Sequence, residues 1–382
     1  MNSPTSTQDR KRLAYFVTED WYFCSHRLSL AVAAREAGYT VYVITRVAAH
    51  GDEIEAAGLN LIPFDLSRRG KNPITEANMV RRLARIYKEL RPDIVHHVAL
   101  KPVIYGSIAA RIAGVPAVVN AMAGLGYLYS SSDSAARIFR PIFIRLIKLL
   151  LSNDRGMLIL QNPDDVRVFC DSGVVDRSRV VLIQGSGVDP QQYRSEPEHE
   201  GTPIVLLASR MLWDKGVGEF VRAAEILKRS GCDAKFVLAG DIDEENPASI
   251  SVAQLEAWTE CGDVEWWGRC SDMPGLFAKV HIVCLPSYRE GLPRVLLEAA
   301  SCGRPIITTD VPGCREVVTH GENGFLVPVK DEDALADAIR TALDSAELRS
   351  RMGQAGRERV QARFAIDKVV ADTLAVYGTL SR

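Results

Sequence analysis

Short apolar segments rich in Val, Ile and Leu alternate with amphipathic segments along almost the whole chain. The apolar segments have the length of strands that are buried on both faces of a parallel sheet, and the segments between them show helical spacing. We therefore predict an α/β protein. The predicted strands are LAYFVT (13–18), TVYVIT (40–45), DIVHHV (93–98), AVVNAM (117–122), GMLILQ (156–161), VVLIQG (180–185), PIVLLAS (203–209), KFVLAG (235–240), VEWWG (264–268), HIVCLPS (281–287) and RPIITTD (304–310).

The predicted elements form two series, separated by the polar stretch DPQQYRSEPEHEGTP (189–203), which we interpret as a linker. We predict two Rossmann-like, doubly wound domains, residues 1–190 and 191–363, that face each other across a cleft. Ligands bind beyond the carboxyl ends of the strands in such sheets, so the cleft is the expected site. The last segment, 364–382, is predicted to be a helix that returns to the N-terminal domain.

Composition agrees with a water-soluble protein, since 47% of the residues are hydrophobic and 25% are charged. The sequence has no apolar segment of membrane-spanning length, and its polar start lacks the apolar core of a signal peptide. We therefore expect a cytoplasmic protein with reduced cysteines. Residues 1–195 contain 25 Lys+Arg and 18 Asp+Glu, whereas the remainder contains 21 and 30. This asymmetry suggests that the first half meets something anionic.

Candidate chemistry begins with YREGLPRVLLEAASCG (288–303), in which Glu290 and Glu298 stand eight positions apart. Pro293 and Gly303 predict the start and the end of a helix between them. The amide groups at such a helix start attract an anion, and two carboxylates can hold the ends of one elongated ligand. A solvent-exposed helix face with one capping carboxylate is the alternative explanation of this spacing.

A second segment, ASRMLWDKG (208–216), carries Arg210 and Lys215 in a loop that follows a predicted strand. Fixed cations at that position suit a diphosphate, although such a loop can also carry two bases without a ligand. Asp241 and Asp243 form a D-x-D pattern after another strand. We interpret it as a loop at the edge of the cleft rather than as a metal site, because the two cations already supply positive charge.

These segments together resemble the retaining GT-B glycosyltransferases of family 4. The resemblance covers essentially the whole chain and is densest over residues 203–330, in SRMLWDKGVGEFVRAAEIL, YREGLPRVLLEAASCG and HGENGFLVPVKDEDALADAI. It implies an enzyme that transfers a hexose from a UDP-sugar with retention of configuration. It also implies that the reaction needs no metal or other cofactor.

Residue by residue, the resemblance implies that Arg210 and Lys215 neutralise the donor diphosphate and are catalytic together with Glu290, which contacts the donor sugar. Glu298 is implied to accept hydrogen bonds from the donor ribose. The other donor-binding residues that the resemblance implies are Gly291, Leu292, Arg294 and Arg269.

The N-terminal domain resembles the family more loosely, because TEDWYFCSHR (18–27) stands where many relatives have a glycine-rich loop. His26 and Arg27 are candidates to contact an acceptor pyrophosphate, and His26 can equally cap or pack the start of a helix. Glycines in a strand-end loop can admit a ligand close to the backbone or form a plain turn. The other acceptor-binding candidates after strands are Lys101, Gly124 and Gly126.

ARIFRPIFIRLIKLLLS (136–152) mixes basic residues with large apolar ones, a composition that suits the surface of an anionic membrane. Packing into the N-terminal domain is the alternative. The basic residues that we expect to contact the membrane are Arg137, Arg140, Arg145 and Lys148.

Short motifs such as GLG, DE-x-NP and PSY-x-EG-x-P resemble a branch of the family that acts on polyprenyl-diphosphate-linked saccharides. That likeness implies an acceptor held in the membrane, N-acetylgalactosamine as the transferred sugar, and a location on the inner face of the bacterial cytoplasmic membrane. A galactosyl- or other hexosyltransferase of capsule or O-antigen synthesis is the alternative within the class. A UDP-sugar epimerase of the same architecture is a further alternative, and the basic segment argues against it. We expect no nucleic-acid partner.

Overall fold

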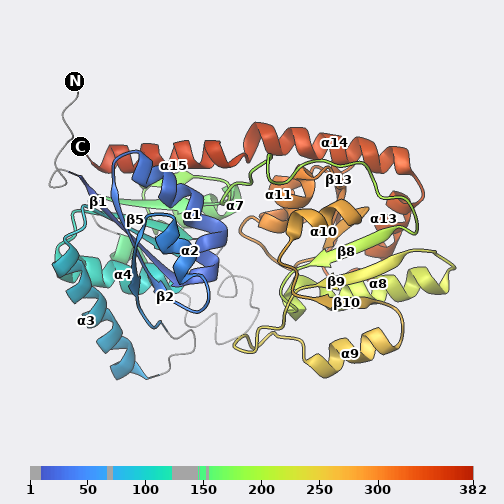
Figure 1. Ribbon diagram of the computed structural model, residues 1–382, viewed down its shortest axis with the longest axis horizontal. Helices are drawn as coiled ribbons and strands as arrows, with labels where there is room; N and C mark the ends of the chain where they lie inside the picture. The colour runs from blue at the N-terminus through green and yellow to red at the C-terminus, as the bar shows by residue number, and fades with distance from the viewer. Residues whose placement is uncertain (1–9, 67–71, 123–144, 146, 152–154, 382) are drawn as a thin grey trace. The chain divides into compact units, whose positions relative to one another are not determined.

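The computed structural model describes residues 10–66, 72–122, 145, 147–151 and 155–381. The chain divides into two compact units, each a parallel sheet covered by helices (Figure 1). Unit 1 comprises Met1–Ser186 and Asp367–Arg382, and unit 2 comprises Gly187–Ile366. These divisions lie a few residues from the positions expected from the sequence, after residues 190 and 363.

The sheet of unit 1 has the order β3-β2-β1-β4-β5-β6-β7, and its strand pairs are all parallel. The chain winds outward from β1 to β3 and then returns to β4 on the other side of β1. Leu13 through Val17 have no solvent exposure, as expected for a central strand covered on both faces. The strands are β1 (Arg12–Glu19), β2 (Thr40–Arg46), β3 (Asn60–Pro63), β4 (Ile94–Val98), β5 (Ala117–Met122), β6 (Gly156–Leu160) and β7 (Val180–Leu182).

Local sequence signals explain where helices of unit 1 begin and end. The side chains of Asn72 and Asn162 accept hydrogen bonds from the backbone N–H groups of Ile74 and Asp165, and a proline follows each asparagine. Gly114 ends a helix with a φ of 70°. The helices are α1 (Asp20–Glu36), α2 (Gly51–Ala56), α3 (Pro73–Leu90), α4 (Leu100–Ala113), α7 (Pro163–Asp171) and the 3₁₀ turn η1 (Arg177–Arg179).

The last helix, α15 (Ile366–Leu380), packs on the sheet of unit 1. Its Tyr377 is completely buried, and the hydroxyl oxygen lies 2.9 Å from that of Tyr15 and 2.5 Å from Nδ1 of His96. Val369 and Val376 belong to the same apolar core. A buried polar contact and apolar packing thus tie the end of the chain to β1 and β4.

The sheet of unit 2 repeats this winding with the order β10-β9-β8-β11-β12-β13 and only parallel pairs. One apolar cluster lies with α8 and α13 and another with α10, α11 and α14. The elements are β8 (Ile204–Ala208), η2 (Trp213–Lys215), α8 (Val217–Arg229), β9 (Lys235–Ala239), α9 (Val252–Glu260), β10 (Glu265–Gly268), α10 (Met273–Lys279), β11 (Ile282–Leu285), α11 (Arg294–Ser301), β12 (Ile306–Thr309), α12 (Cys314–Val317), β13 (Gly324–Val327), α13 (Glu332–Leu343) and α14 (Ala346–Arg363).

Every strand predicted from the apolar pattern is present, but β3 and β13 were not predicted. Both are four-residue edge strands with a mixed burial pattern. The helix predicted over 25–38 begins earlier, at Asp20, directly after β1.

The polar stretch 189–203, interpreted above as a linker, belongs to unit 2, and that interpretation was wrong. Tyr193 is only 4% exposed, and its backbone oxygen accepts a hydrogen bond of 2.8 Å from Oγ of Ser301. Arg304 donates to the backbone oxygen of Glu196 at 3.0 Å. Most side chains of the stretch are exposed, but these hydrogen bonds and the buried Tyr193 attach it to unit 2.

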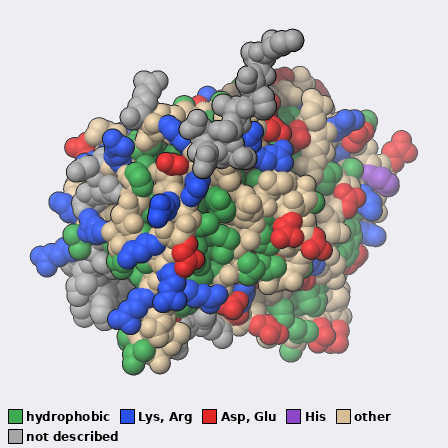
Figure 2. Space-filling model, turned by 60° about the vertical axis from the view of Figure 1, so that its left-hand side comes forward, with side chains coloured by type: hydrophobic (Ala, Val, Ile, Leu, Met, Phe, Trp, Pro, Cys, Tyr) green, Lys and Arg blue, Asp and Glu red, His purple; other side chains and the backbone are tan. Residues whose placement is uncertain are grey.

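The surface carries charge unevenly. Figure 2 shows Lys and Arg side chains spread over the left of that face and Asp and Glu side chains more toward its right. Among the described residues, no helix combines the length and the apolar character that crossing a bilayer requires.

Ala99, between β4 and α4, has a φ of 79° and a ψ of 163°, a conformation that only glycine adopts readily. Its backbone N–H donates to the oxygen of Ala121 on the neighbouring strand, which holds the residue in place. Ala99→Gly should therefore raise the free energy of unfolding by about 1 kcal/mol, because the relief of strain exceeds the entropy gained by the unfolded chain. Urea unfolding would measure the change. Ala109→Gly, inside α4, is the matched control and should lower the free energy of unfolding. A similar decrease for Ala99→Gly would mean that Ala99 is unstrained.

Candidate functional site

Three residues expected to bind the donor, Arg210, Lys215 and Glu290, lie in the loops that follow the carboxyl ends of β8 and β11. These strands are neighbours in the sheet, and the chain winds away from them in opposite directions, which is where open α/β sheets bind ligands. Arg210 and η2 follow β8, and residues 286–293 follow β11. Oγ of Ser287 donates to the backbone oxygen of Asp214 at 3.1 Å, so a hydrogen bond joins the two loops.

Lys215 and Glu290 form an ion pair across these two strand ends. Nζ of Lys215 lies 2.5 Å from Oε1 of Glu290, and their side chains are only 20% and 11% exposed. Burial and the Glu290 carboxylate raise the pKa of the nearby Cys314 thiol to about 12, so that side chain stays neutral. A cation held in such a weakly solvated position attracts an anionic ligand more strongly than one in water.

Arg210 lies at the rim of this site. Its side chain is 45% exposed, and Nη1 lies 2.6 Å from Oδ2 of Asp243, which belongs to the D-x-D pattern. The backbone N–H of Asp243 donates to Oγ of Ser249. The second aspartate of the pattern therefore serves as the counter-ion of Arg210, and the loop holds this guanidinium beside the end of β8.

Glu298 is buried on α11, with 7% of its surface exposed. Its Oε1 accepts hydrogen bonds from the Tyr193 hydroxyl at 2.9 Å and from Nε of Arg294 at 2.7 Å. Burial raises the pKa of Glu298, and the Arg294 charge and the two hydrogen bonds partly offset that rise. The exposed helix face considered as an alternative for this glutamate was thus wrong.

Two glycines let the loops of the site approach one another. Gly216 has a φ of 73°, and a Cβ there would lie 2.1 Å from the backbone oxygen of Pro286. Gly313 has a φ of 85°, and a Cβ there would lie 2.6 Å from the backbone oxygen of Gly291. Any other residue at either position would push the loop after β11 away.

The remaining residues implied for the donor take different positions around this loop. Arg294 begins α11 and Arg269 follows β10 with its side chain exposed. Leu292 is buried in the core of unit 2, so only its backbone can meet a ligand. Gly291 is half-buried between Glu290 and the start of α11.

On unit 1, the acceptor candidates near β1 are packed by their neighbours. The His26 ring stacks on Tyr22 at a centroid distance of 4.1 Å, and its Nδ1 lies 2.6 Å from Oγ of Ser25. Arg27 is 5% exposed, and its Nε has no hydrogen-bond partner among the described residues. The packing alternative considered for His26 matches this arrangement.

Lys101 lies in the first turn of α4, and its Nζ is 3.2 Å from Oε2 of Glu76 on α3. Arg145 and Lys148 are exposed. The other residues considered for the acceptor or the membrane, Gly124, Gly126, Arg137 and Arg140, lie outside the described residues.

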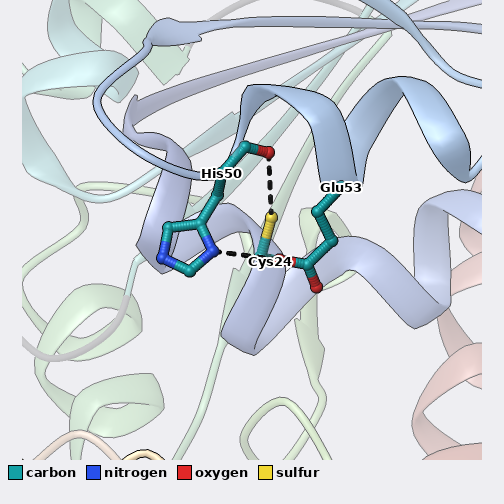
Figure 3. A group of neighbouring side chains, drawn as sticks. All are labelled: Cys24, His50 and Glu53. Carbon is teal, nitrogen blue, oxygen red and sulfur yellow. Dashed lines mark hydrogen bonds and ion pairs between the residues drawn. The ribbon is translucent and has the colours of Figure 1, made fainter.

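Three side chains of kinds that can bind a metal ion lie close together on unit 1, although they are not adjacent in the sequence. Ligand atoms of Cys24, His50 and Glu53 lie within 4.8 Å of one another (Figure 3). Nδ1 of His50 is 2.9 Å from Oε2 of Glu53, and the Cys24 thiol donates to the backbone oxygen of His50. Burial and the Glu53 carboxylate raise the pKa of that thiol to about 12. A metal ion would have to displace this proton and the existing contacts, so we assign no metal here.

The sequence matches two family models, "Glycosyl transferases group 1" over residues 189–359 and "Glycosyl transferase 4-like" over residues 12–162. The alpha-D-kanosaminyltransferase of Streptomyces kanamyceticus is 32% identical, with 72% of this chain and 73% of that protein covered. The N,N'-diacetylbacillosaminyl-diphospho-undecaprenol alpha-1,3-N-acetylgalactosaminyltransferase of Campylobacter jejuni is 29% identical, with coverage of 85% and 87%. An Escherichia coli UDP-Gal:alpha-D-GlcNAc-diphosphoundecaprenol alpha-1,3-galactosyltransferase is 24% identical, with 69% of each chain covered.

Solved structures share the fold at low sequence identity. Sucrose-phosphate synthase from Thermosynechococcus elongatus superposes with a TM-score of 0.80 at 21% identity, over 97% of this chain and 99% of that chain. Anabaena HepE, solved with UDP and glucose, superposes with a TM-score of 0.77 at 18% identity, over 97% and 100%. The predicted GT-B class, with two Rossmann-like units, is confirmed.

Sequence reasoning missed Tyr193 and Gly313. Tyr193 stands in the polar stretch interpreted as a linker, where its side chain is the only aromatic one, and that was the available signal. Gly313 follows Val-Pro directly after a predicted strand, a sequence typical of a turn.

Gly216→Ala should lower the free energy of unfolding by roughly 3 kcal/mol, because the new Cβ meets the rigid backbone of Pro286. Gly231→Ala is the control, since Gly231 also has a positive φ of 82° but has open space around its Cβ position. The free energy of unfolding of the Gly231→Ala variant should fall by only about 1 kcal/mol, because alanine disfavours the left-handed conformation. Urea unfolding of both variants would measure the difference. Equal losses would mean that the loop after β11 tolerates a side chain at position 216.

Proposed function

The chain belongs to the group 1 glycosyltransferases, and from that premise we propose that it is a retaining, metal-independent enzyme that moves N-acetylgalactosamine from a UDP-sugar to a polyprenyl-diphosphate-linked saccharide. The names of the Campylobacter jejuni and Escherichia coli relatives both describe transfer to a sugar on diphospho-undecaprenol. The first of them supports N-acetylgalactosamine, and the second makes galactose the second candidate.

The observation that carries the proposal is the Lys215–Glu290 ion pair, which joins the ends of two neighbouring strands, with Arg210 in the loop that follows the first of them. Breaking the bond between the sugar and the diphosphate leaves negative charge on the leaving phosphate. Two cations that are already in place stabilise this charge without reorganisation. Arg210 exchanges Asp243 for the diphosphate, while Lys215 keeps Glu290 beside the sugar.

Retention follows if the acceptor hydroxyl attacks from the side of the leaving group. The bond from the anomeric carbon to the phosphate oxygen breaks, the bond to the acceptor oxygen forms, and the acceptor proton passes to the phosphate oxygen. Glu290 then binds a sugar hydroxyl and is no nucleophile, which agrees with its close pairing to Lys215.

The nucleotide part of the donor lies along α11 in this proposal. Glu298 accepts hydrogen bonds from the ribose hydroxyls, and Arg294 is its neighbour on the same helix. The backbone amides near Gly291 and Leu292 face the phosphate or sugar oxygens at the positive end of the helix dipole. Arg269, exposed after β10, contacts the base.

Unit 1 would meet the lipid-linked acceptor at the membrane surface. Leu149 and Ile112 are 57% and 52% exposed, and Nη2 of Arg111 donates to the backbone oxygen of Leu149. A hollow of about 650 Å³ on the same unit is lined in part by Lys148, Arg177 and Arg179. Exposed apolar side chains among cations are what an anionic membrane surface attracts.

Arg210→Ala and Lys215→Ala should each lower kcat by about 100-fold or more, because each removes one preorganised cation from the developing phosphate charge. The measurement is sugar transfer from UDP-, GDP- and ADP-sugars to polyprenyl-diphosphate acceptors, with folding checked by circular dichroism. Arg222→Ala, which removes an exposed guanidinium from the same unit, is the control and should be active. Near-normal rates for the first two variants would refute their role. Conversion of one UDP-sugar into another without an acceptor would indicate an epimerase.

Arg145→Glu combined with Lys148→Glu should weaken binding to vesicles that contain anionic lipid, because two attractive charges worth about 2 kcal/mol or more become repulsive. Co-sedimentation with anionic and with neutral vesicles would measure it. Arg222→Glu combined with Arg229→Glu reverses two exposed charges on α8 and should change binding little. If the first pair binds as the unaltered protein does, the membrane surface lies elsewhere.

A further inference from the structure

Tyr193 has no role in the function proposed above, yet its hydroxyl touches the carboxylate expected to hold the ribose. We propose that Tyr193 is a positioning residue for the donor nucleotide: together with Arg294 it occupies one oxygen of Glu298 and leaves the other oxygen to the ribose. This inference rests on the proposed function, because it concerns the same donor site.

The hydrogen bonds of Glu298 are divided unequally between its two oxygens. Oε1 accepts both the Tyr193 hydroxyl at 2.9 Å and Nε of Arg294 at 2.7 Å. Oε2 has no hydrogen bond to a described residue. It is not completely enclosed by the protein. The fold therefore holds the carboxylate by one oxygen and leaves the second accessible to an incoming donor group.

Tyr193 is itself held firmly enough to orient another group. Its ring lies in the core of unit 2 with its centroid 6.3 Å from that of Phe277. Its backbone oxygen accepts hydrogen bonds from Oγ of Ser301 at 2.8 Å and from Nη1 of Arg357 at 3.1 Å. A side chain fixed at both ends has little freedom to lose when the donor binds, so the direction of the Glu298 carboxylate is set in advance.

The same contacts favour the ionised form of Glu298, which its burial disfavours. Burial raises the pKa of the carboxyl group, and Arg294 from its own helix and Tyr193 from the 189–203 segment oppose that rise. Farther groups around it are the Cys302 thiol and the guanidinium of Arg357 on α14. Only the ionised form offers Oε2 purely as an acceptor to ribose hydroxyls. Loss of the Tyr193 hydroxyl therefore raises the pH at which donor binding fails.

Tyr193→Phe keeps the ring in the core and removes only the hydroxyl. We expect the KM for the UDP-sugar to rise about tenfold near neutral pH, as for the loss of a hydrogen bond to a charged group. KM should rise further in mildly acidic buffer, at a higher pH than in the unaltered enzyme. kcat should change little, because the ribose is bound equally in the ground state and the transition state. A merely structural tyrosine would alter stability without this pH dependence.

Three further variants make the test decisive. Tyr377→Phe removes a buried hydroxyl from unit 1 and should leave KM unchanged. Glu298→Gln should raise KM, and adding Tyr193→Phe to it should have no further effect, because the hydroxyl acts through the carboxylate. Arg294→Gln removes the other donor and should also raise KM, which keeps the test available if Tyr193→Phe folds poorly.

The outcomes separate this inference from the proposed function. An effect of Glu298→Gln without one of Tyr193→Phe, or fully additive effects of the two, would overturn the positioning role alone. An unchanged KM in Glu298→Gln would instead refute the ribose contact itself.

Discussion

The pairing of β8 with β11 is the constraint on which the candidate site depends. Val205 and Leu206 pair with Ile282 and Val283, and all four side chains are fully buried. A shift by one residue would turn each side chain to the opposite face of the sheet, so the register cannot slip. The loops that follow these strands are therefore held in one relation, and Lys215 meets Glu290 although 74 residues separate them in the chain.

Around that constraint, unit 2 combines charges that would be unfavourable if they stood alone. A buried carboxylate such as that of Glu298 costs free energy unless hydrogen bonds and an opposite charge accompany it. Arg294 and Tyr193 supply these from two parts of the chain. The incomplete satisfaction of the carboxylate is what makes it suited to a ligand, because a group with every acceptor site occupied has no capacity left for recognition.

The sheet of unit 1 has a similar strand order, but different residues follow its first strand. No glycine-rich loop follows β1; the chain enters α1 at Asp20, whose Oδ2 accepts hydrogen bonds from the backbone N–H groups of Ala48, Ala49 and His50. Burial opposes ionisation of Asp20, but these hydrogen bonds outweigh it and lower the pKa of the carboxyl group. The β1 end thus anchors the loop after β2.

The local sequence pattern was sufficient to predict the central strands and the ends of α11. It also predicted the loops that carry Arg210, Lys215 and Glu290. Buried parallel strands are continuous apolar runs, and ligand-binding residues follow their carboxyl ends. The same reasoning failed for the edge strands β3 and β13, which are short and only partly buried.

Only the tertiary structure brings Tyr193 of the 189–203 segment to Glu298, which lies 105 positions away in the chain. The same holds for the grouping of Cys24 with His50 and Glu53. The sequence does not show whether the hydrogen-bond partner of a polar residue is water or a distant side chain. Only the folded chain determines which of the two supplies its hydrogen bonds.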